Sequence, residues 1–366
     1  MHEDGNHRLL TRHTAAGPEH GPAWGVCAEV DGLFGEPRRA TYELFGWAPQ
    51  AEVRGWIGSR VWLVPEDETL DPWLVEDAEC PGRPAADSLV LTGLDDHLGP
   101  PEGHRGRVRV HDGQRWLGSC REFTRVLPAD RPAPPLVLRG LLPGDLLRAA
   151  PMKGTRKALD LEQAALEIRD DHGDPFTDLP LRTRIIAWYP SAYGADLVDL
   201  ELDGTDFTPV PVHARPVLER WLAGPPDAPG AWAGLDTRRR EVWLDVVRDR
   251  SCRRVRPDLP AGRTYELDGR TYELDGRHVT DEAGLHLALG EAVNGPGGYF
   301  GGCLDALVDC LRGTFGHTAP ATLVWREAAT AREHLSRRLA WDGRPRDLFA
   351  QVLDVLARGG VRVVLA

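Results

Sequence analysis

The sequence lacks the features that would assign the protein to a membrane, a metal site or a known catalytic family. No run approaches the roughly 18 consecutive apolar residues that a membrane span needs. The six cysteines form no CxxC pair, and Asp95–His97 and Asp170–Asp174 are interpreted as solvated acidic turns, so we expect no metal and no other cofactor. P-loop, HExxH and GxSxG motifs are absent too, and we expect no enzymatic activity.

Lysine is almost absent, since Lys153 and Lys157 are the only two among 44 basic residues. Acidic residues outnumber basic ones by 56 to 44, and the resulting formal charge of −12 argues against direct binding to nucleic acid. Most of this charge is N-terminal, because the residues from 263 onward contribute only −2. A basic protein partner would be attracted to such a chain.

The sequence does not begin with the basic segment and apolar core that are typical of a secretory signal. Its cysteines are scattered rather than arranged as a disulfide framework, which is typical of a reducing compartment. We therefore expect a cytoplasmic protein that contacts no membrane.

Length and proline placement predict several domains. At 366 residues the chain exceeds the usual size of one domain, and 42% hydrophobic residues suffice for buried cores. Residues 1–20 are polar and aperiodic, which is typical of a flexible tail. Four prolines between residues 127 and 135 mark a linker, so we expect domains of unknown function at 21–127 and 136–250. A basic joint then leads to a C-terminal domain at 263–366.

Short apolar runs between Gly, Pro and Asp clusters predict strands in the first domain, for example at Arg60–Val64, Ser88–Thr92 and Arg107–Val110. The second domain shows a more mixed pattern. Its expected elements are a helix at Ala158–Arg169, strands at Thr183–Tyr189 and Asp196–Leu202, a helix at Val217–Leu222 and a hairpin at Ala231–Val247. The N-terminal region is therefore expected to be α+β or mainly β.

A seven-residue segment, Arg-Thr-Tyr-Glu-Leu-Asp-Gly, occurs twice in succession at 263–269 and 270–276. Arrays of structural repeats need longer units and about three copies. We interpret the duplication as a lengthened joint, of which only one copy is needed as a strand.

The C-terminal domain alternates between strand and helix patterns. Thr271–Leu274 alternates like a strand, and Leu285, Ala288 and Leu289 belong to the apolar stripe of a helix with Thr280 as its expected N-cap. The remaining expected elements are a helix at 303–311, a strand at 322–325, helices at 327–338 and 347–357, and a strand at 361–365. The order βααβααβ predicts an α/β fold with a three-stranded parallel sheet and helical crossovers.

The densest motif of the chain is Tyr299–Leu311, which reads Tyr-Phe-Gly-Gly-Cys-Leu-Asp-Ala-Leu-Val-Asp-Cys-Leu. Together with Tyr272–Gly276, Leu285-His286 and Leu323–Arg326, this segment resembles the barstar family of intracellular ribonuclease inhibitors. The family shows an aromatic pair and Gly, then Leu-Asp-Ala-Leu, an aromatic residue and Asp-Cys-Leu. The resemblance covers residues 270–366 and implies the α/β fold that the pattern of elements also predicts.

The resemblance implies that the domain inhibits a small, basic, barnase-like ribonuclease as a bacterial immunity protein. Asp309 would mimic a phosphate in the active site, and Asp305, one helical turn earlier, would add a second charge. Tyr299 would pack against the catalytic histidine. The expected partner contacts are Tyr299, Gly301, Cys303, Leu304, Asp305, Val308, Asp309, Gly313, Thr314 and Asp354.

The motif departs from the family at several contact positions. Val308 replaces an aromatic residue, Cys303 replaces a polar one, and Thr314 stands where the family often has Trp, so we expect a smaller contact area.

An alternative hypothesis keeps the fold as an interaction module for a protein that is not a ribonuclease, with the N-terminal domains as scaffold or sensor. A third hypothesis makes an N-terminal domain enzymatic. Without the surrounding motif, two acids at this spacing would indicate only a solvated helix face.

Overall fold

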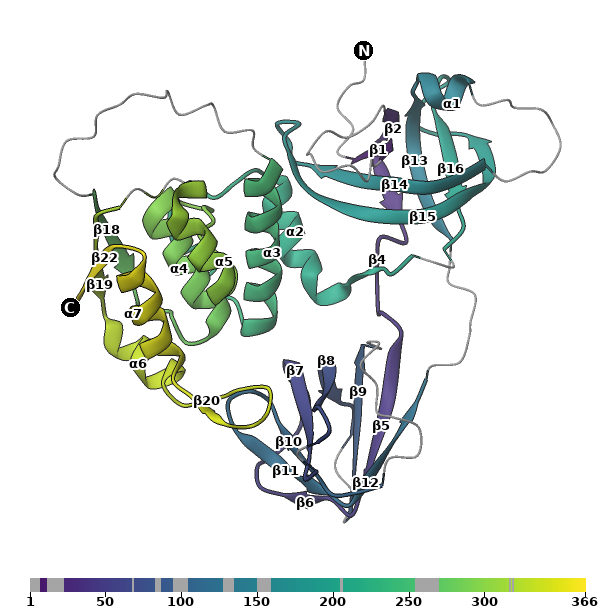
Figure 1. Ribbon diagram of the computed structural model, residues 1–366. Helices are drawn as coiled ribbons and strands as arrows, with labels where there is room; N and C mark the ends of the chain where they lie inside the picture. The colour runs from purple at the N-terminus through teal and green to yellow at the C-terminus, as the bar shows by residue number, and fades with distance from the viewer. Residues whose placement is uncertain are drawn as a thin grey trace. The chain divides into compact units, whose positions relative to one another are not determined.

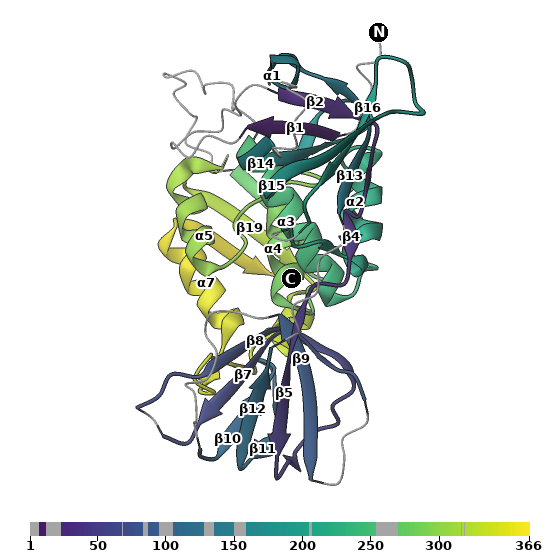
Figure 2. The same cartoon turned by 90° about the vertical axis from the view of Figure 1, so that its right-hand side faces the viewer.

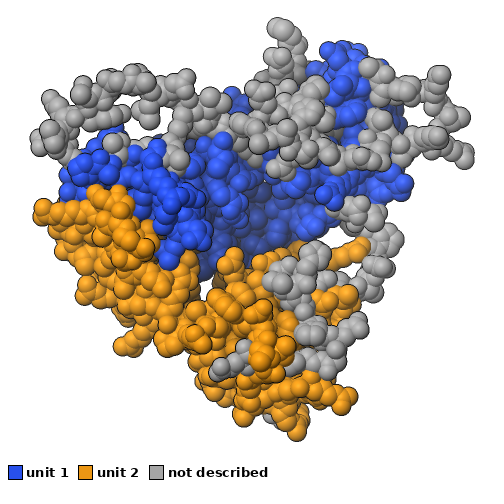
Figure 3. Space-filling view, viewed as in Figure 1, with its two compact units in different colours: residues 1–36, 131–274, 286–323 blue, residues 37–130, 275–285, 324–366 orange. Residues whose placement is uncertain are grey.

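The computed structural model describes residues 7–11, 23–67, 69–82, 87–94, 105–127, 135–149, 159–204, 207–253, 270–315, 317 and 319–366. The chain forms two compact units, which Figure 3 shows in blue and orange. Unit 1 consists of residues 1–36, 131–274 and 286–323, and unit 2 consists of residues 37–130, 275–285 and 324–366.

Unit 1 contains a closed antiparallel barrel (Figure 1). Its strand order is β16 (Val198–Leu202), β15 (Pro175–Pro190), β14 (Leu159–Arg169), β1 (His7–Thr11), β2 (Ala23–Cys27), β13 (Leu136–Pro143) and β3 (Glu29–Asp31). The sheet closes because β16 also pairs with β13, where Leu138 lies opposite Leu200. Both side chains are fully buried, so the inward positions of these strands form the core of the barrel.

The helix expected at Ala158–Arg169 is wrong, because residues 159–169 form β14; Ala158 itself lies outside the described residues. Its Leu, Ala, Glu and Gln residues favour a helix by only a few tenths of a kcal/mol each. In the barrel, β14 pairs with β1 on one side and with β15 on the other, and it buries Leu166 and Ile168. Pairing on both edges and burial of these side chains outweigh the local preference.

The barrel contains strands from segments that were expected from the sequence to form a tail and two separate domains. β1 lies within the segment expected to be a flexible tail, yet it pairs with both β2 and β14. β2 and β3 come from the expected first domain, whereas β13 to β16 come from the expected second one. The strands expected at 183–189 and 196–202 are confirmed as parts of β15 and β16.

Two helices follow the barrel in unit 1, α2 (Arg215–Leu222) and α3 (Thr237–Arg253). α2 confirms the expected helix, but the hairpin expected at 231–247 is wrong. Asp236 Oδ1 accepts a hydrogen bond from the amide of Arg239 at 2.9 Å and thereby caps α3. The buried rings of Trp221 and Trp243 meet edge to face, with centroids 5.3 Å apart. Smaller elements of unit 1 are β4 (Phe34–Gly35), α1 (Asp145–Ala149), β17 (Val210–Pro211) and η1 (Val212–Ala214).

Unit 2 contains a second antiparallel sheet, whose strands other than β6 are labelled in Figure 2. Its order is β12 (Glu122–Val126), β5 (Arg39–Phe45), β9 (Ser88–Leu94), β8 (Trp73–Cys80), β7 (Gly55–Pro65), β10 (Val108–His111), β11 (Trp116–Cys120) and β6 (Ala48–Pro49). β5 leads into β6 and β11 leads into β12, and the pairings β5 to β12 and β6 to β11 curl the sheet onto itself. Tyr42, Trp47 and Trp73 belong to its buried core. The expected strands are confirmed in β7, β9 and β10, and the N-terminal region is mainly β.

The C-terminal region has a three-stranded parallel sheet in the order β18 (Arg270–Asp275), β19 (Ala321–Arg326) and β22 (Val361–Leu365). The connecting elements are α4 (Glu282–Asn294), α5 (Leu304–Asp309), the π-turn η2 (Cys310–Thr314), α6 (Ala328–Leu335), β20 (Arg338–Leu339), β21 (Pro345–Arg346) and α7 (Leu348–Arg358). This order confirms the predicted α/β fold, with a small hairpin, β20 and β21, between α6 and α7. β18 is the second copy of the repeated segment; the first copy lies outside the described residues.

The N-terminus of α4 differs from the prediction by one residue. Asp281, rather than Thr280, caps the helix, because Asp281 Oδ1 accepts a hydrogen bond from the amide of Gly284 at 2.7 Å. The side chain of Asp281 is buried. At α7 the expected start is confirmed, since Asp347 Oδ1 accepts from the amide of Ala350 at 2.9 Å.

Candidate functional site

The motif Tyr299–Leu311 folds as a tight loop, the helix α5 and the start of the π-turn. Gly301 has a φ of +85°, and a Cβ there would lie 2.8 Å from the backbone nitrogen of Leu307. Only glycine satisfies both conditions, so Gly301 holds the loop against the first turn of α5. The amide of Leu307 donates to the carbonyl of Cys303 at 2.9 Å, which starts the helix.

α5 places the two predicted carboxylates one turn apart on its exposed side. The side chain of Asp309 is 67% exposed, and Asp305 is exposed as well. Leu307, on the other side of the helix, is fully buried. Leu304 and Val308 are partly exposed and supply apolar surface next to the acids. This part of the predicted site therefore forms one accessible, acidic helix face.

Tyr299 does not lie on the surface, because its side chain is only 6% exposed. Its ring meets Phe315 edge to face, with centroids 5.3 Å apart. Asn294 Nδ2 donates to the carbonyls of Tyr299 and Phe315 at 2.7 and 3.1 Å, which ties the start of the motif to the residues that follow its end. Gly301 is buried as well. In this arrangement neither Tyr299 nor Gly301 is open to a partner.

The helix α3 covers this loop. Leu244 Cδ2 lies 3.9 Å from the position that a Cβ of Gly302 would occupy. Arg248 and Cys252 follow Leu244 by one and two helical turns, on the same side of α3. The pKa of Tyr299 is raised to about 12, mainly by burial and also by the neighbouring thiols of Cys310 and Cys252, against an opposing effect of Arg248. The helix α3 was not predicted from the sequence, although two signals of a helix are present. Asp236 is a suitable N-cap, and Leu244, Arg248 and Cys252 follow at intervals of four residues.

The other predicted contact residues are spread over both units. Gly313 is exposed with a φ of +96° in the π-turn, which Thr314 ends, and Cys303 is exposed at the N-terminus of α5. Asp354 is exposed on α7 and forms an ion pair with Arg358. The structure thus brings residues 303–314 into one continuous segment of unit 1, while Asp354 belongs to unit 2.

Other features expected from the sequence are turns and free thiols. Asp170 Oδ1 accepts hydrogen bonds from the amides of His172 and Asp174, at 3.0 and 2.9 Å, so Asp170–Asp174 is a turn, but Asp170 itself is buried rather than solvated. Asp95–His97 lies outside the described residues. All six cysteines are free, and Cys310 is buried. Within the described ranges, no three His, Cys, Asp or Glu residues are grouped as a metal site requires. No helix in that part of the chain is long and apolar enough to cross a membrane.

No curated protein matches the sequence. Residues 269–357 match the family described as Barstar (barnase inhibitor). The match begins one residue before β18 and ends within α7, and it contains the covered loop, α5 and both carboxylates. The C-terminal region of this chain is therefore a barstar family domain.

Proposed function

We propose that the C-terminal domain inhibits a small basic ribonuclease by covering its active site with α5. The match to a family of barnase inhibitors, combined with two exposed carboxylates on α5, carries this proposal. A ribonuclease gathers cationic side chains to bind phosphate and to stabilise the charge of the transition state. Carboxylates of an inhibitor can bind the same cations. The protein would act in the cytoplasm, as an immunity protein, by occupation and without catalysis.

Asp309 is proposed to take the place of a substrate phosphate. In the free protein its carboxylate lies 3.0 Å from Arg312 Nη1, and both side chains are mostly exposed. An exposed ion pair contributes about 0–1 kcal/mol, so a cation of the ribonuclease can replace Arg312 at little cost. Asp305 adds a second negative charge, which speeds association with a basic partner.

The buried position of Tyr299 limits the proposed contact. While α3 covers the loop, the accessible part of the predicted site is α5 with the π-turn, together with the partly exposed side chains of Leu304 and Val308. Interfaces gain much of their affinity from buried aromatic anchors. We therefore propose a contact that depends on charge more than on aromatic packing.

A second candidate function is binding of a basic protein that is not a ribonuclease, through the same acidic helix face. The size of the rest of the chain favours it, because the family match spans only 269–357 and two β-sheet structures precede it. In this proposal the two sheets act as scaffold or sensor, and binding has no effect on RNA cleavage.

The test is to titrate the full chain against a panel of small basic microbial ribonucleases, barnase among them, while following cleavage of a fluorogenic RNA. The wild type inhibits at least one of them, and Asp309→Ala weakens this inhibition. Glu333→Ala, which removes a carboxylate from the exposed side of α6, is the matched control and leaves inhibition unchanged. Absence of inhibition across the panel, or equal inhibition by Asp309→Ala, contradicts the proposal. Binding without inhibition supports the second candidate.

A further inference from the structure

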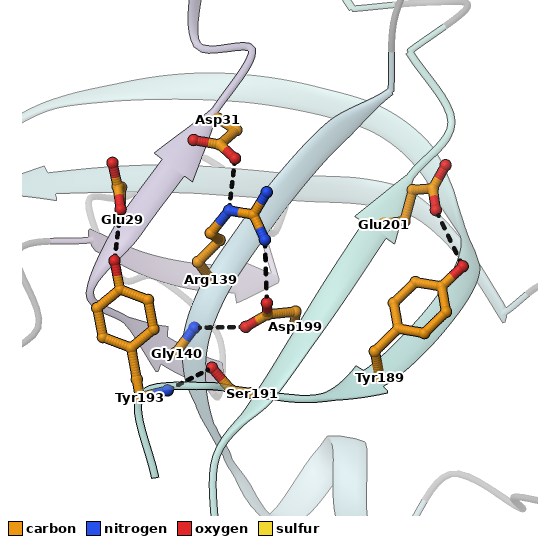
Figure 4. Close-up of polar contacts among 9 residues, drawn as sticks. All are labelled: Glu29, Asp31, Arg139, Gly140, Tyr189, Ser191, Tyr193, Asp199 and Glu201. Carbon is orange, nitrogen blue, oxygen red and sulfur yellow. Dashed lines mark hydrogen bonds and ion pairs between the residues drawn. The ribbon is translucent and has the colours of Figure 1, made fainter.

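The outer face of the unit 1 barrel carries two exposed tyrosines that are held in place by carboxylates (Figure 4). The side chains of Tyr189 and Tyr193 are 53% and 51% exposed. Tyr193 Oη donates to Glu29 Oε2 at 2.6 Å, and Tyr189 Oη donates to Glu201 Oε2 at 3.4 Å. We call Tyr189, Tyr193 and the carboxylates around them the tyrosine face.

Strand register explains why these side chains gather on one side of the barrel. Glu29 of β3 lies opposite Arg139 of β13, and Asp199 of β16 lies opposite Tyr189 of β15. Two positions before Arg139 on β13, Val137 lies opposite both Asp31 of β3 and Glu201 of β16. Leu138 and Leu200, at alternate positions, are fully buried inside the barrel. Because side chains alternate along a strand, the acids and Tyr189 share the outward side.

The ring of Tyr193 is fixed from beneath as well as by its hydroxyl. Gly140 has a φ of +61°, and a Cβ there would lie 3.0 Å from Cγ of Tyr193, so the ring packs directly over this glycine. The amide of Tyr193 donates to Ser191 Oγ at 3.2 Å. An aromatic side chain that is ordered before binding loses little conformational entropy when a partner packs on it.

The charge of the tyrosine face is strongly negative. Four carboxylates, those of Glu29, Asp31, Asp199 and Glu201, lie around Arg139, which bridges Asp31 and Asp199. Burial would raise the pKa of Asp199, but hydrogen bonds from Ser191 and from the Gly140 amide, together with the hydrogen bond and the charge of Arg139, outweigh it and hold this pKa below its usual range. Arg139 thus neutralises part of the charge, and a net negative surface remains beside the two rings.

We propose that the tyrosine face docks an arginine-containing basic segment of a protein partner. A guanidinium can stack on an exposed tyrosine ring and bind a carboxylate in the same plane. Exposed tyrosines next to acids provide both contacts, and exposed tyrosines are common anchors of protein interfaces. Nucleic acids and anionic lipid surfaces are repelled by the same carboxylates. This proposal involves the barrel alone and does not rest on ribonuclease inhibition by α5.

The experiment measures binding of the full chain to a fluorescent nonapeptide in which arginine and glycine alternate, by anisotropy at physiological salt. The double variant Glu29→Gln/Glu201→Gln is expected to lower the affinity at least tenfold. The matched control Glu52→Gln/Glu66→Gln removes the same charge from exposed acids of unit 2 and is expected to change the affinity less than twofold. Tyr189→Ala is expected to lower the affinity severalfold, and a peptide with lysine for arginine binds more weakly to the wild type.

Equal losses in the two acid double variants overturn the proposal, because they indicate attraction by overall charge. An unchanged affinity in Tyr189→Ala overturns it as well, since the ring then has no part in binding. Tyr193→Phe keeps the ring over Gly140 and serves as a second variant that preserves packing; it is expected to retain most of the affinity. Asp305→Ala and Asp309→Ala leave peptide binding unchanged, so failure of this proposal and failure of the proposed inhibitory function are distinguishable.

Discussion

Arg312 Nη1 lies 3.0 Å from Asp309 Oδ1, so the carboxylate that is proposed to mimic a phosphate already binds a guanidinium in the free protein. Arg312 follows Asp309 by three residues, in the middle of the π-turn. A ribonuclease that binds Asp309 with its own cation must displace Arg312 or share the carboxylate with it. Displacement of Arg312 therefore reduces the free energy of binding by a small, measurable amount.

Substitutions of the two members of this pair are expected to act in opposite directions. Arg312→Ala removes an exposed competing pair worth at most about 1 kcal/mol and so strengthens inhibition by up to about fivefold. Asp309→Ala removes the proposed central contact and weakens inhibition by at least about 30-fold, which corresponds to about 2 kcal/mol. Inhibition constants for RNA cleavage provide the measurement. Arg344→Ala, at an exposed arginine paired with Asp342, is the control and has no effect.

Tyr299 is expected to titrate as a buried phenol. Burial raises its pKa to about 12, compared with about 10 for an exposed tyrosine. Leu244→Ala removes part of the cover that α3 provides and lowers this pKa towards the ordinary value. The measurement is the alkaline titration of tyrosinate absorbance, corrected by subtracting that of Tyr299→Phe. A component near 10 in the wild type that disappears in Tyr299→Phe would contradict the covered loop.

The buried ion pair between Arg250 and Asp170 is expected to be important for the stability of unit 1. Their side chains are 5% and 1% exposed, and Arg250 Nη1 lies 3.4 Å from Asp170 Oδ2. Asp170→Ala leaves the guanidinium buried without this carboxylate and also removes the acceptor of the turn at 170–174, so we expect a loss of about 3 kcal/mol or more. Urea unfolding measures it. Arg184→Ala, which breaks an exposed pair with Asp203, is expected to cost less than about 1 kcal/mol.

Unit 2 is expected to lose stability as the pH falls, because of His111. This side chain is fully buried, and its Nδ1 accepts a hydrogen bond from the amide of Gly113 at 3.1 Å. Burial lowers its pKa below the ordinary 6.5, so the unfolded chain binds the proton more readily than the folded one. Stability is therefore fully present above about pH 6.5 and decreases as the pH falls from there towards the folded pKa.

Thermal unfolding between about pH 8 and pH 5 measures this dependence. His111→Asn retains an acceptor for the Gly113 amide and is expected to flatten the acidic part of the curve. The exposed His334 of α6 serves as the control, because His334→Asn should leave the curve unchanged. A wild-type curve that is already flat below pH 6.5 would refute the assignment to His111.

The C-terminal fold was predictable because its local signals agree with its tertiary contacts. The turn at Asp275-Gly276, the apolar stripe of α4 and the glycine pair after α7 each occur where the structure places a turn, a helix and a helix end. Asp305 and Asp309 were placed on one exposed helix face by spacing alone. The burial of Tyr299 was not predictable in this way, because the residues that cover it come from α3, more than 45 positions away in the sequence.

The N-terminal errors have a different cause. β14 consists of residues that favour a helix, and its strand state depends on β1 and β15, which lie far from it or beyond a turn in the sequence. The segment of α3 was predicted to be a hairpin because two of its buried residues are Arg240 and Arg250. Arginine is ordinarily expected on the solvent side of a helix, so the sequence shows no clear apolar stripe here. Contacts of long sequence separation decide both elements.

The sequence by itself determined the barstar family domain, its order of elements and the acidic side of α5, since these depend on periodicity and on one compact motif. Only the tertiary structure decided that β1 to β3 share a barrel with β13 to β16, that α3 covers Tyr299 and that two tyrosines lie beside four carboxylates on the barrel surface. Strand register and helix packing join residues that are distant in the chain, and neither leaves a short-range pattern from which it could be derived.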